Sequence, residues 1–270
     1  MSDFSACFLL VFGQLAVGGL AALAVPPFAV LERGFYKSSA SVFVGCAVVY
    51  LGGRLALALR PRPVAFGPLE ATLWCAFTAA ASAYLVSLWG DGVRFRARAY
   101  AAALFLGTAA LATSGAGYRV GPALSFAGLF YPLAFLTGAL ALGAVATGML
   151  LGHWYLIDLG LSIVPLRRLF RYFVGTVLVH LAVLALAVVV IASGPTGARA
   201  ASLWQDHAAL LAARFALGPL AALALASMIH RTLQIPQTMA ATGLFYIAIL
   251  FVLVGEILGR LILFRTSLPL

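Results

Sequence analysis

The chain has 270 residues, of which 64% are hydrophobic and only 9% are charged, and its mean hydropathy is +1.10. Soluble domains carry about a quarter charged residues, so this composition excludes an ordinary soluble protein and predicts a polytopic membrane protein. The net charge of +10 would suggest a nucleic-acid partner in a soluble protein. Here the basic residues lie mostly in short connectors between apolar runs, which favours a role in topology and contact with membrane lipids, and no nucleic acid.

Eight apolar segments follow one another along the chain, each long enough for the roughly 20 residues that a membrane-spanning helix needs. The connectors are short and rich in Gly, Pro and Arg, and none could hold a soluble domain. Residues 1–270 are therefore expected to form a single membrane domain, an all-α bundle of about eight transmembrane helices. The predicted spans are 5–31, 38–59, 69–89, 97–115, 123–151, 169–193, 207–230 and 238–262.

An even number of spans places both termini on one side of the membrane. The loops on the opposite side contain nine Lys or Arg residues, against five in the loops on the terminal side. Because basic loops stay in the cytoplasm, this bias predicts termini on the external, periplasmic side. The N-terminus lacks a basic region and a small-residue cleavage site, so the first span is expected to be retained.

Six polar residues interrupt the spans at a similar depth, toward the terminal side. A charge in the hydrocarbon costs about 2.5–3.5 kcal/mol on insertion scales, so these side chains are expected to pair inside the bundle. Two of them, Glu256 and Arg260, are four residues apart and can pair along one helix face. The six are Gln14, Arg54, Glu70, Arg214, Glu256 and Arg260.

Two interpretations of these residues stay open. Those near the interface could simply snorkel toward the head groups and pair there. Gln14 and Arg214 lie deeper, and a pocket that combines an amide, a guanidinium and a carboxylate suits a lipid-soluble quinone. The quinone carbonyls would accept hydrogen bonds, and the carboxylate would relay the protons that accompany two electrons. The candidate quinone-binding residues are Gln14, Arg54, Arg214, Glu256 and Arg260.

The histidines define a second candidate site and a cofactor alternative. His153, Trp154, Tyr155 and Asp158 together could carry protons, although an interfacial aromatic belt explains them as well. A b-type haem needs two histidines at matching depth, which only His153 and His230 satisfy, at the membrane edge. Haem b is therefore not expected, and the cysteine spacing predicts no metal site.

Two segments resemble a known family. Phe12-Gly-Gln-Leu-Ala-Val-Gly-Gly19 and Gly255-Glu-Ile-Leu-Gly-Arg260 are similar to the first and last helices of the membrane-anchor subunit of the dimethyl-sulfoxide reductase family. That subunit belongs with the polysulfide reductase (NrfD-like) quinone subunits, which also have eight spans and external termini. The match covers about 15 residues at the two ends, and the middle of the chain does not align.

The resemblance implies an anchor in the bacterial cytoplasmic (inner) membrane without a metal centre of its own. It would bind a ferredoxin-like iron–sulfur subunit and, through it, a molybdopterin catalytic subunit, and would exchange electrons with menaquinone or ubiquinone. In this reading Gln14 and Arg214 hydrogen-bond the quinone carbonyls, Glu256 relays protons and Arg260 holds Glu256 ionised. Whether such a subunit counts as an enzyme stays open. The alternatives are a secondary transporter or channel, or a structural membrane subunit, with or without haem.

Overall fold

The computed structural model describes residues 2–59, 66–119, 125–158, 160–193, 205–235 and 237–270. In these ranges the protein is all-helical, and eight helices are long and apolar enough to cross a membrane. The chain is therefore a multi-pass integral membrane protein, as the composition predicts. The helices are α1 (Ser2–Ala22), α2 (Arg33–Ala58), α3 (Pro68–Ser87), α4 (Val93–Gly117), η1 with α5 (Ala127–Leu129 and Phe130–Trp154), α6 (Val164–Ser193), α8, η2 and α9 (Ala208–Phe215, Ala216–Leu220 and Ala221–Gln234, one span) and α10 (Thr238–Thr266).

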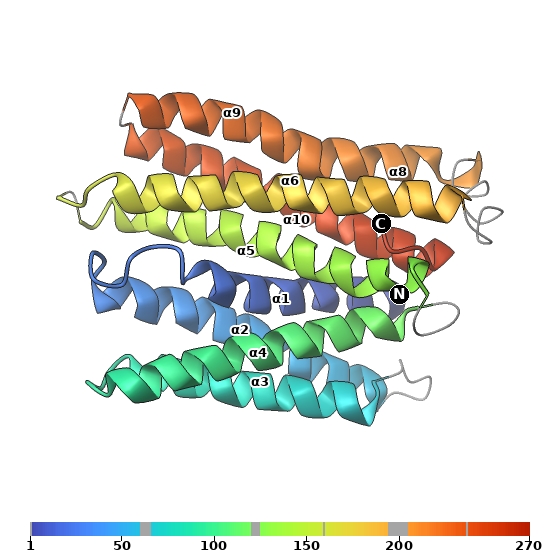
Figure 1. Ribbon diagram of the computed structural model, residues 1–270, viewed down its shortest axis with the longest axis horizontal. Helices are drawn as coiled ribbons and strands as arrows, with labels where there is room; N and C mark the ends of the chain where they lie inside the picture. Colours follow the sequence, from blue (N-terminus) through green and yellow to red (C-terminus); the bar gives the residue numbers. More distant parts are fainter. Residues whose placement is uncertain (1, 60–65, 120–124, 159, 194–204, 236) are drawn as a thin grey trace.

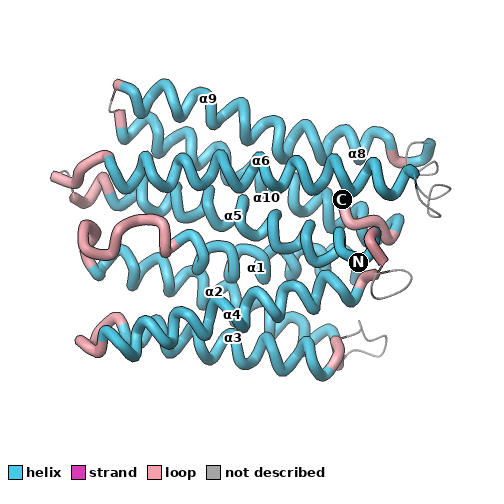
Figure 2. The backbone as a smooth tube through the Cα atoms, viewed as in Figure 1, coloured by secondary structure: helices cyan, strands magenta, loops and turns pink. Residues whose placement is uncertain are grey.

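The helices lie side by side along the long axis of the molecule, and both termini lie at the same end (Figure 1). The described connections between helices are short loops at the two ends of the bundle (Figure 2). One group consists of α2, α3 and α4, the other of α6, α8, α9 and α10, and α1 and α5 lie between them. This arrangement agrees with the predicted placement of both termini on one side.

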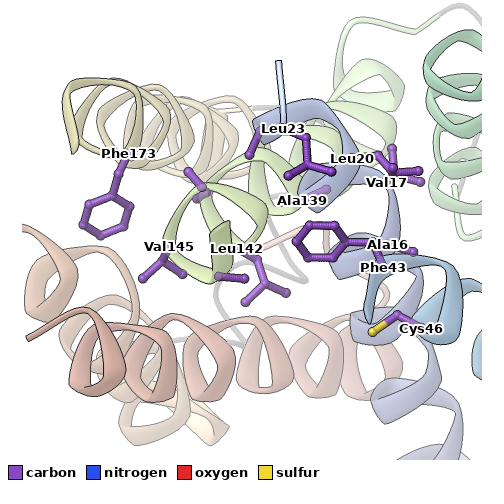
Figure 3. Close-up of a cluster of buried hydrophobic side chains, with 14 of the residues drawn as sticks. Ala16, Val17, Leu20, Leu23, Phe43, Cys46, Ala139, Leu142, Val145 and Phe173 are labelled. Carbon is purple, nitrogen blue, oxygen red and sulfur yellow. The ribbon is translucent and has the colours of Figure 1, made fainter. Parts of the chain in front are cut away.

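The centre of the bundle is the contact between α1 and α5. Of their most apolar windows, 61% and 72% of residues are buried, against 28–44% for the other spans, so these two helices face protein rather than lipid. Small and aliphatic side chains fill the interface, including Ala16 and Leu20 of α1 and Ala139 and Leu142 of α5 (Figure 3).

Glycines allow the two central helices to touch backbone to backbone. A Cβ atom on Gly18 would overlap the carbonyl group of Ala139, and one on Gly143 would overlap the backbone of Gly18. Close approach through small residues is the usual way in which helices associate in lipid, where no hydrophobic effect drives them together. The Gly138–Gly143 stretch, rich in Gly, Ala and Leu, therefore packs as its composition indicates.

The helix boundaries differ from the predicted spans mainly at the first one. The predicted span 5–31 is wrong at its C-terminal end, because α1 ends at Ala22 and a turn follows. Pro26 and Pro27 have no amide hydrogen to continue the helix. A tyrosine side chain satisfies a backbone carbonyl near the helix end, since the Tyr100 hydroxyl donates to the carbonyl of Leu20. The sixth predicted span starts at 169, whereas α6 begins five residues earlier, at Val164. Residues 123–124 of the fifth predicted span lie outside the described ranges.

Candidate functional site

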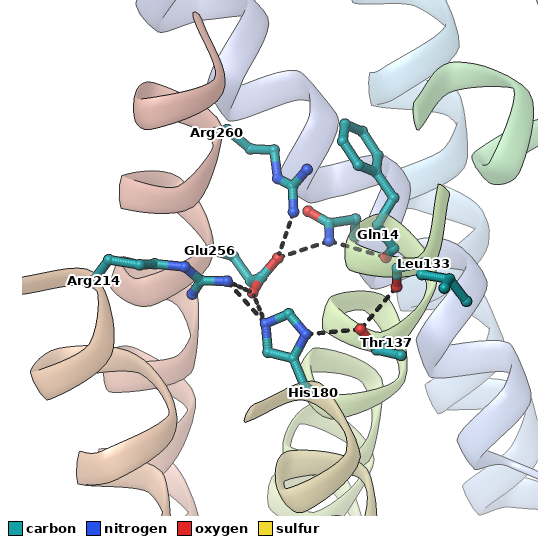
Figure 4. Close-up of polar contacts among 8 residues, drawn as sticks. Gln14, Leu133, Thr137, His180, Arg214, Glu256 and Arg260 are labelled. Carbon is teal, nitrogen blue, oxygen red and sulfur yellow. Dashed lines mark hydrogen bonds and ion pairs between the residues drawn. The ribbon is translucent and has the colours of Figure 1, made fainter. Parts of the chain in front are cut away.

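Glu256 lies at the centre of a buried polar cluster to which α1, α6, α8 and α10 contribute (Figure 4). Its Oε1 accepts a hydrogen bond from Nη2 of Arg214 at 2.8 Å. Its Oε2 accepts one from Nε2 of Gln14 at 2.7 Å and one from Nη2 of Arg260 at 3.2 Å. These four side chains are each at most 1% exposed. Charged neighbours and one amide therefore replace the water that the carboxylate has lost.

Four of the five residues predicted to bind quinone thus meet in one place. Glu256 and Arg260 pair at i and i+4 on α10, as their spacing indicates. Gln14 and Arg214 reach the same carboxylate from α1 and α8, although they are distant in sequence. Counting depth along each span correctly placed these side chains at a common level.

His180 and Thr137 extend the cluster. The Thr137 hydroxyl donates to the carbonyl of Leu133 at 2.8 Å, so it accepts from Nδ1–H of His180, which is also 2.8 Å away. In that tautomer Nε2 of His180 accepts from Nη2 of Arg214 at 2.8 Å. The same Nε2 lies 3.0 Å from Oε1 of Glu256. Nε2 of His180 therefore lies between Arg214 and Glu256, and a proton on Nε2 could bond to the carboxylate only if Arg214 gave up its own contact with this nitrogen.

Three polar atoms of the cluster are buried without a hydrogen-bond partner in the described structure. They are Oε1 of Gln14, an acceptor, and Nε of Arg214 and of Arg260, both donors. The guanidinium of Arg260 also stacks over the ring of Phe135, with 3.8 Å between its Cζ and the ring centroid. Buried groups of this kind are rare in proteins and call for a ligand, a water or another explanation.

Glycines on the facing helices make room for these long side chains. A Cβ on Gly138 would collide with the Glu256 carboxylate and lie 2.8 Å from Nε2 of Gln14. A Cβ on Gly259 would lie 2.8 Å from Nε of Arg214. The Gly255–Arg260 motif therefore supplies both charged groups that α10 contributes to the cluster, and a glycine that makes room for the arginine of α8.

The seventh span is interrupted beside the cluster. Residues Ala216–Leu220 form a π-helical segment in which Gly218 has φ −84° and ψ −105°, outside the helical region, and Pro219 lacks an amide hydrogen. A cavity of about 10 Å³ lies here, and Gly218, Pro219, Arg214, His180 and Glu256 contribute to its lining. It has room for about one water molecule. Such π-bulges inside helices are frequent at functional sites.

Arg54 lies in a different cluster, which contradicts the prediction that it joins Gln14 and Glu256. Its Nη2 is 3.5 Å from Oε2 of Glu70. The reason is the packing order, because α2 packs against α1 and α3, whereas α10 packs against α5, α9 and α1. Equal depth in the membrane does not bring two helices into contact.

The Glu70 cluster is closed by uncharged donors. Oε1 of Glu70 accepts from the hydroxyls of Ser114 at 2.5 Å and of Tyr50 at 3.1 Å, and Nε1 of Trp74 donates to Ser114 at 2.9 Å. These contacts tie α2, α3 and α4 together. Arg54 and Glu70 therefore pair, as the structural interpretation predicts, but the buried Arg54 side chain does not snorkel toward the head groups.

Replacing Ser114 by alanine is expected to lower the free energy of unfolding by about 1–3 kcal/mol, because it leaves the buried indole N–H of Trp74 without an acceptor. Denaturant unfolding in detergent, followed by tryptophan fluorescence, measures the change. Thr113→Ala is the matched control, since among the described residues that hydroxyl bonds only to the carbonyl of Ala109 on its own helix. Equal effects of the two substitutions would show that the Ser114 contacts contribute nothing.

The second predicted site is not assembled into one pocket. Trp154 packs edge-on against Phe35, with 6.1 Å between ring centroids. The Tyr155 hydroxyl donates to the carbonyl of Ser162 at 2.6 Å, and burial raises the pKa of Tyr155 to about 12, so this donor keeps its proton at neutral pH. Oδ1 of Asp158 accepts from a backbone amide two residues on, and the His153 side chain is exposed. Tyr155 and Asp158 thus bond to the backbone of the turn after α5, whereas Trp154 packs against α2.

The two histidines of the haem alternative have different surroundings. His230 stacks on the ring of Phe170 at 5.9 Å and lies 3.1 Å from Nε2 of Gln234, whereas His153 is exposed at the end of α5. Among the residues that the structure describes, no group of three or more His, Cys, Asp or Glu could hold a metal ion.

A roomier cavity of about 300 Å³ lies at the end of the bundle opposite to the termini. Tyr36, Tyr84 and Tyr100 line it together with the guanidinium of Arg96. The hydroxyl of Tyr36 donates to the carbonyl of Pro26, and that of Tyr100 donates to the carbonyl of Leu20. Nε of Arg96 is buried without a hydrogen-bond partner in the described structure. This volume is within the range of small-ligand sites.

Sequence reasoning missed His180 and Thr137 as members of the main cluster. His180 lies near the middle of its span and has no second histidine at its level, so the pairing of histidines that haem needs does not single it out. Counting its depth from the terminal end of α6, as for the other spans, would have placed it near Gln14 and Glu256. Nothing in the sequence distinguishes Thr137 from other hydroxyls that bond to their own helix.

Comparison with family models, with curated proteins and with solved structures finds no match to this chain. The resemblance to the anchor subunits therefore stays a prediction.

Proposed function

We propose that this chain is the quinone-exchanging membrane subunit of a respiratory oxidoreductase, and that quinone reacts at the Glu256 cluster. The observation that carries the proposal is a fully buried carboxylate–histidine pair, held by two arginines and an amide, with unpaired donors and an unpaired acceptor beside it. A quinone presents acceptor oxygens, and a quinol presents hydroxyl donors, so this set of atoms can bind both forms.

Each residue has a role in this proposal. Gln14 and Arg214 hydrogen-bond the quinone oxygens. Glu256 and His180 deliver or accept the protons when a quinone gains two electrons and two protons to become a quinol. Arg260 keeps Glu256 ionised between turnovers through its contact with Oε2. The electrons would come from, or pass to, the ferredoxin-like iron–sulfur subunit and the molybdopterin subunit that the resemblance implies.

Entry of a quinone requires the cluster to open. The cavity has room for about one water, so a head group must separate the broken span from α6 or α10. We expect the opening to occur at the π-helical segment. The non-helical Gly218 and the missing amide hydrogen of Pro219 give this segment fewer backbone hydrogen bonds than a continuous helix has. Apolar residues such as Val177 and Val252 form the rest of the wall and suit a ligand from the lipid.

Gln14→Leu and Arg214→Leu are expected to reduce quinone-dependent turnover in native membranes by roughly tenfold or more, since each removes a hydrogen bond to a reacting oxygen of about 1.5–3 kcal/mol. Glu256→Gln should lower the maximal rate more than the apparent affinity, because proton transfer is what it loses. Turnover is measured with short-chain ubiquinone and menaquinone analogues. Co-purification with iron–sulfur and molybdenum subunits, unchanged in the variants, shows that assembly is intact.

The aromatic cavity supplies the matched control. Arg96→Gln and Tyr84→Phe alter a cavity at the other end of the bundle and should leave turnover unchanged. If these variants abolish turnover while Gln14→Leu and Arg214→Leu do not, the quinone site is the aromatic cavity and not the cluster. Normal turnover in all four variants would remove quinone chemistry from both places.

A secondary transporter is the second candidate, favoured by one observation. The seventh span is broken inside the membrane beside a buried charged site, which is the arrangement by which many transporters bind substrate. Ion or proton flux in proteoliposomes that is lost in Arg214→Leu, with no iron–sulfur partner co-purifying, would support transport over quinone exchange.

A further inference from the structure

A basic groove lies between the first turns of α6 and the last turns of α9, at the end of the bundle opposite to the termini (Figure 1). Its volume is about 540 Å³. Each helix contributes residues at i, i+3 and i+4, so one face of each helix forms a wall. The lining residues are Arg167, Phe170, Arg171, His230, Leu233 and Gln234.

The groove has an apolar floor and ordered polar walls. Phe170 and Leu233 are buried, and the imidazole of His230 stacks on Phe170. Nη2 of Arg167 donates to the carbonyl of Leu233 at 2.8 Å, which fixes this guanidinium at the C-terminus of α9. No other acceptor in the described part of the chain bonds to its remaining N–H groups or to the exposed guanidinium of Arg171, so these donors can bind a ligand.

The positive charge at the groove is not neutralised by an acid in the described part of the chain. Arg168 and Arg231 are exposed next to the groove and add to its charge. The ion pairs found among the described residues join other arginines, or His180, to Asp91, Glu70 and Glu256, and none includes these four arginines. A site with several arginines and no carboxylate is suited to phosphate oxygens.

The groove lies at the level where lipid head groups occur. α6 begins at Val164 and α9 ends at Gln234, so the lining residues occupy the first two turns of α6 and the last two turns of α9. Along α6 the exposed stripe continues from Arg171 through Gly175 to Leu178. No atom lies within 4 Å of the place where a Cβ of Gly175 would be, so the apolar track, as we call the exposed stripe from Gly175 to Leu178, is open beside the basic groove.

We propose that this groove binds the phosphodiester head group of an anionic phospholipid, whose acyl chain lies along the apolar track of α6. Arg167 and Arg171 hold the phosphate, and Phe170 and Leu233 contact the glycerol and the upper part of the chains. Basic pockets between spans are a recurrent place for anionic lipids. This inference does not depend on the quinone proposal, because it uses other residues at the opposite end of the bundle.

The test uses the full chain in nanodiscs that contain phosphatidylcholine with a small fraction of phosphatidylglycerol, and native mass spectrometry counts the retained phosphatidylglycerol. Arg171→Gln and Arg167→Gln should each lower its retention about fivefold. Arg168→Gln and Arg231→Gln remove the same charge outside the groove and should change retention by less than about twofold. Inorganic phosphate at millimolar concentration should fail to displace the lipid.

Three outcomes would overturn the proposal. Equal losses in the groove variants and their controls would show general attraction to a basic surface. Equal retention of phosphatidylcholine would show that the anionic phosphate is not what the groove recognises. Displacement by inorganic phosphate would assign the site to a soluble phosphate compound instead of a lipid. Because Arg167 also caps α9, Arg171→Gln is the decisive variant, and its melting temperature should equal that of Arg168→Gln.

Discussion

Glu256→Gln is expected to lower the free energy of unfolding by about 3–5 kcal/mol, the usual cost of leaving buried charges without their partner. The carboxylate is the only acid among the described contacts of Arg214, Arg260 and His180, so its loss leaves two guanidinium groups facing each other in an apolar interior. Denaturant unfolding of the purified protein in detergent measures the change.

A double substitution separates charge from packing. Glu256→Gln combined with Arg260→Met removes one cation together with the anion and restores the net charge of the cluster. The double variant should therefore recover part of the lost stability, with a coupling between the two sites of about 0.5–3 kcal/mol. Strictly additive losses would mean that Glu256 and Arg260 do not stabilise each other, against the 3.2 Å contact between them.

Gly18→Ala is the second substitution with a large expected effect, a loss of about 3 kcal/mol in the free energy of unfolding. The new methyl group would overlap the carbonyl of Ala139, and a backbone atom cannot rotate away as a side chain can, so α1 and α5 must separate. Since α1 also carries Gln14, we expect the separation to weaken the Glu256 cluster as well.

Gly45→Ala provides the matched control for this prediction. Gly45 lies inside α2 with open space where a Cβ would be, so alanine should only add helix propensity and stabilise by about 0.5–1 kcal/mol. The difference between the two variants isolates the cost of the helix contact. A stabilising Gly18→Ala would show that α1 and α5 do not touch as closely as the structure has them.

The cluster illustrates what depth alone can predict. The order of the spans gives each residue a level in the membrane, and the levels of Gln14, Arg214, Glu256 and Arg260 agree closely enough for contact. Arg54 has a similar level but belongs to α2, which other helices separate from α10. Two side chains must therefore lie at the same depth to meet, but they meet only if their helices are also neighbours.

The amino-acid sequence is sufficient to predict a multi-pass membrane protein of eight helices with both termini at one end. Those features follow from the length and hydropathy of each segment, which are local properties of the chain. The neighbours of each helix are visible only in the folded protein, as are the contact of His180 with Glu256, the pairing of Arg54 with Glu70 and the basic groove between α6 and α9. The physical reason is that lipid imposes the same apolar composition on every span, so hydropathy carries no information about which faces meet. Small-residue contacts such as Gly18 with Ala139, and charge pairing between distant segments, make that choice.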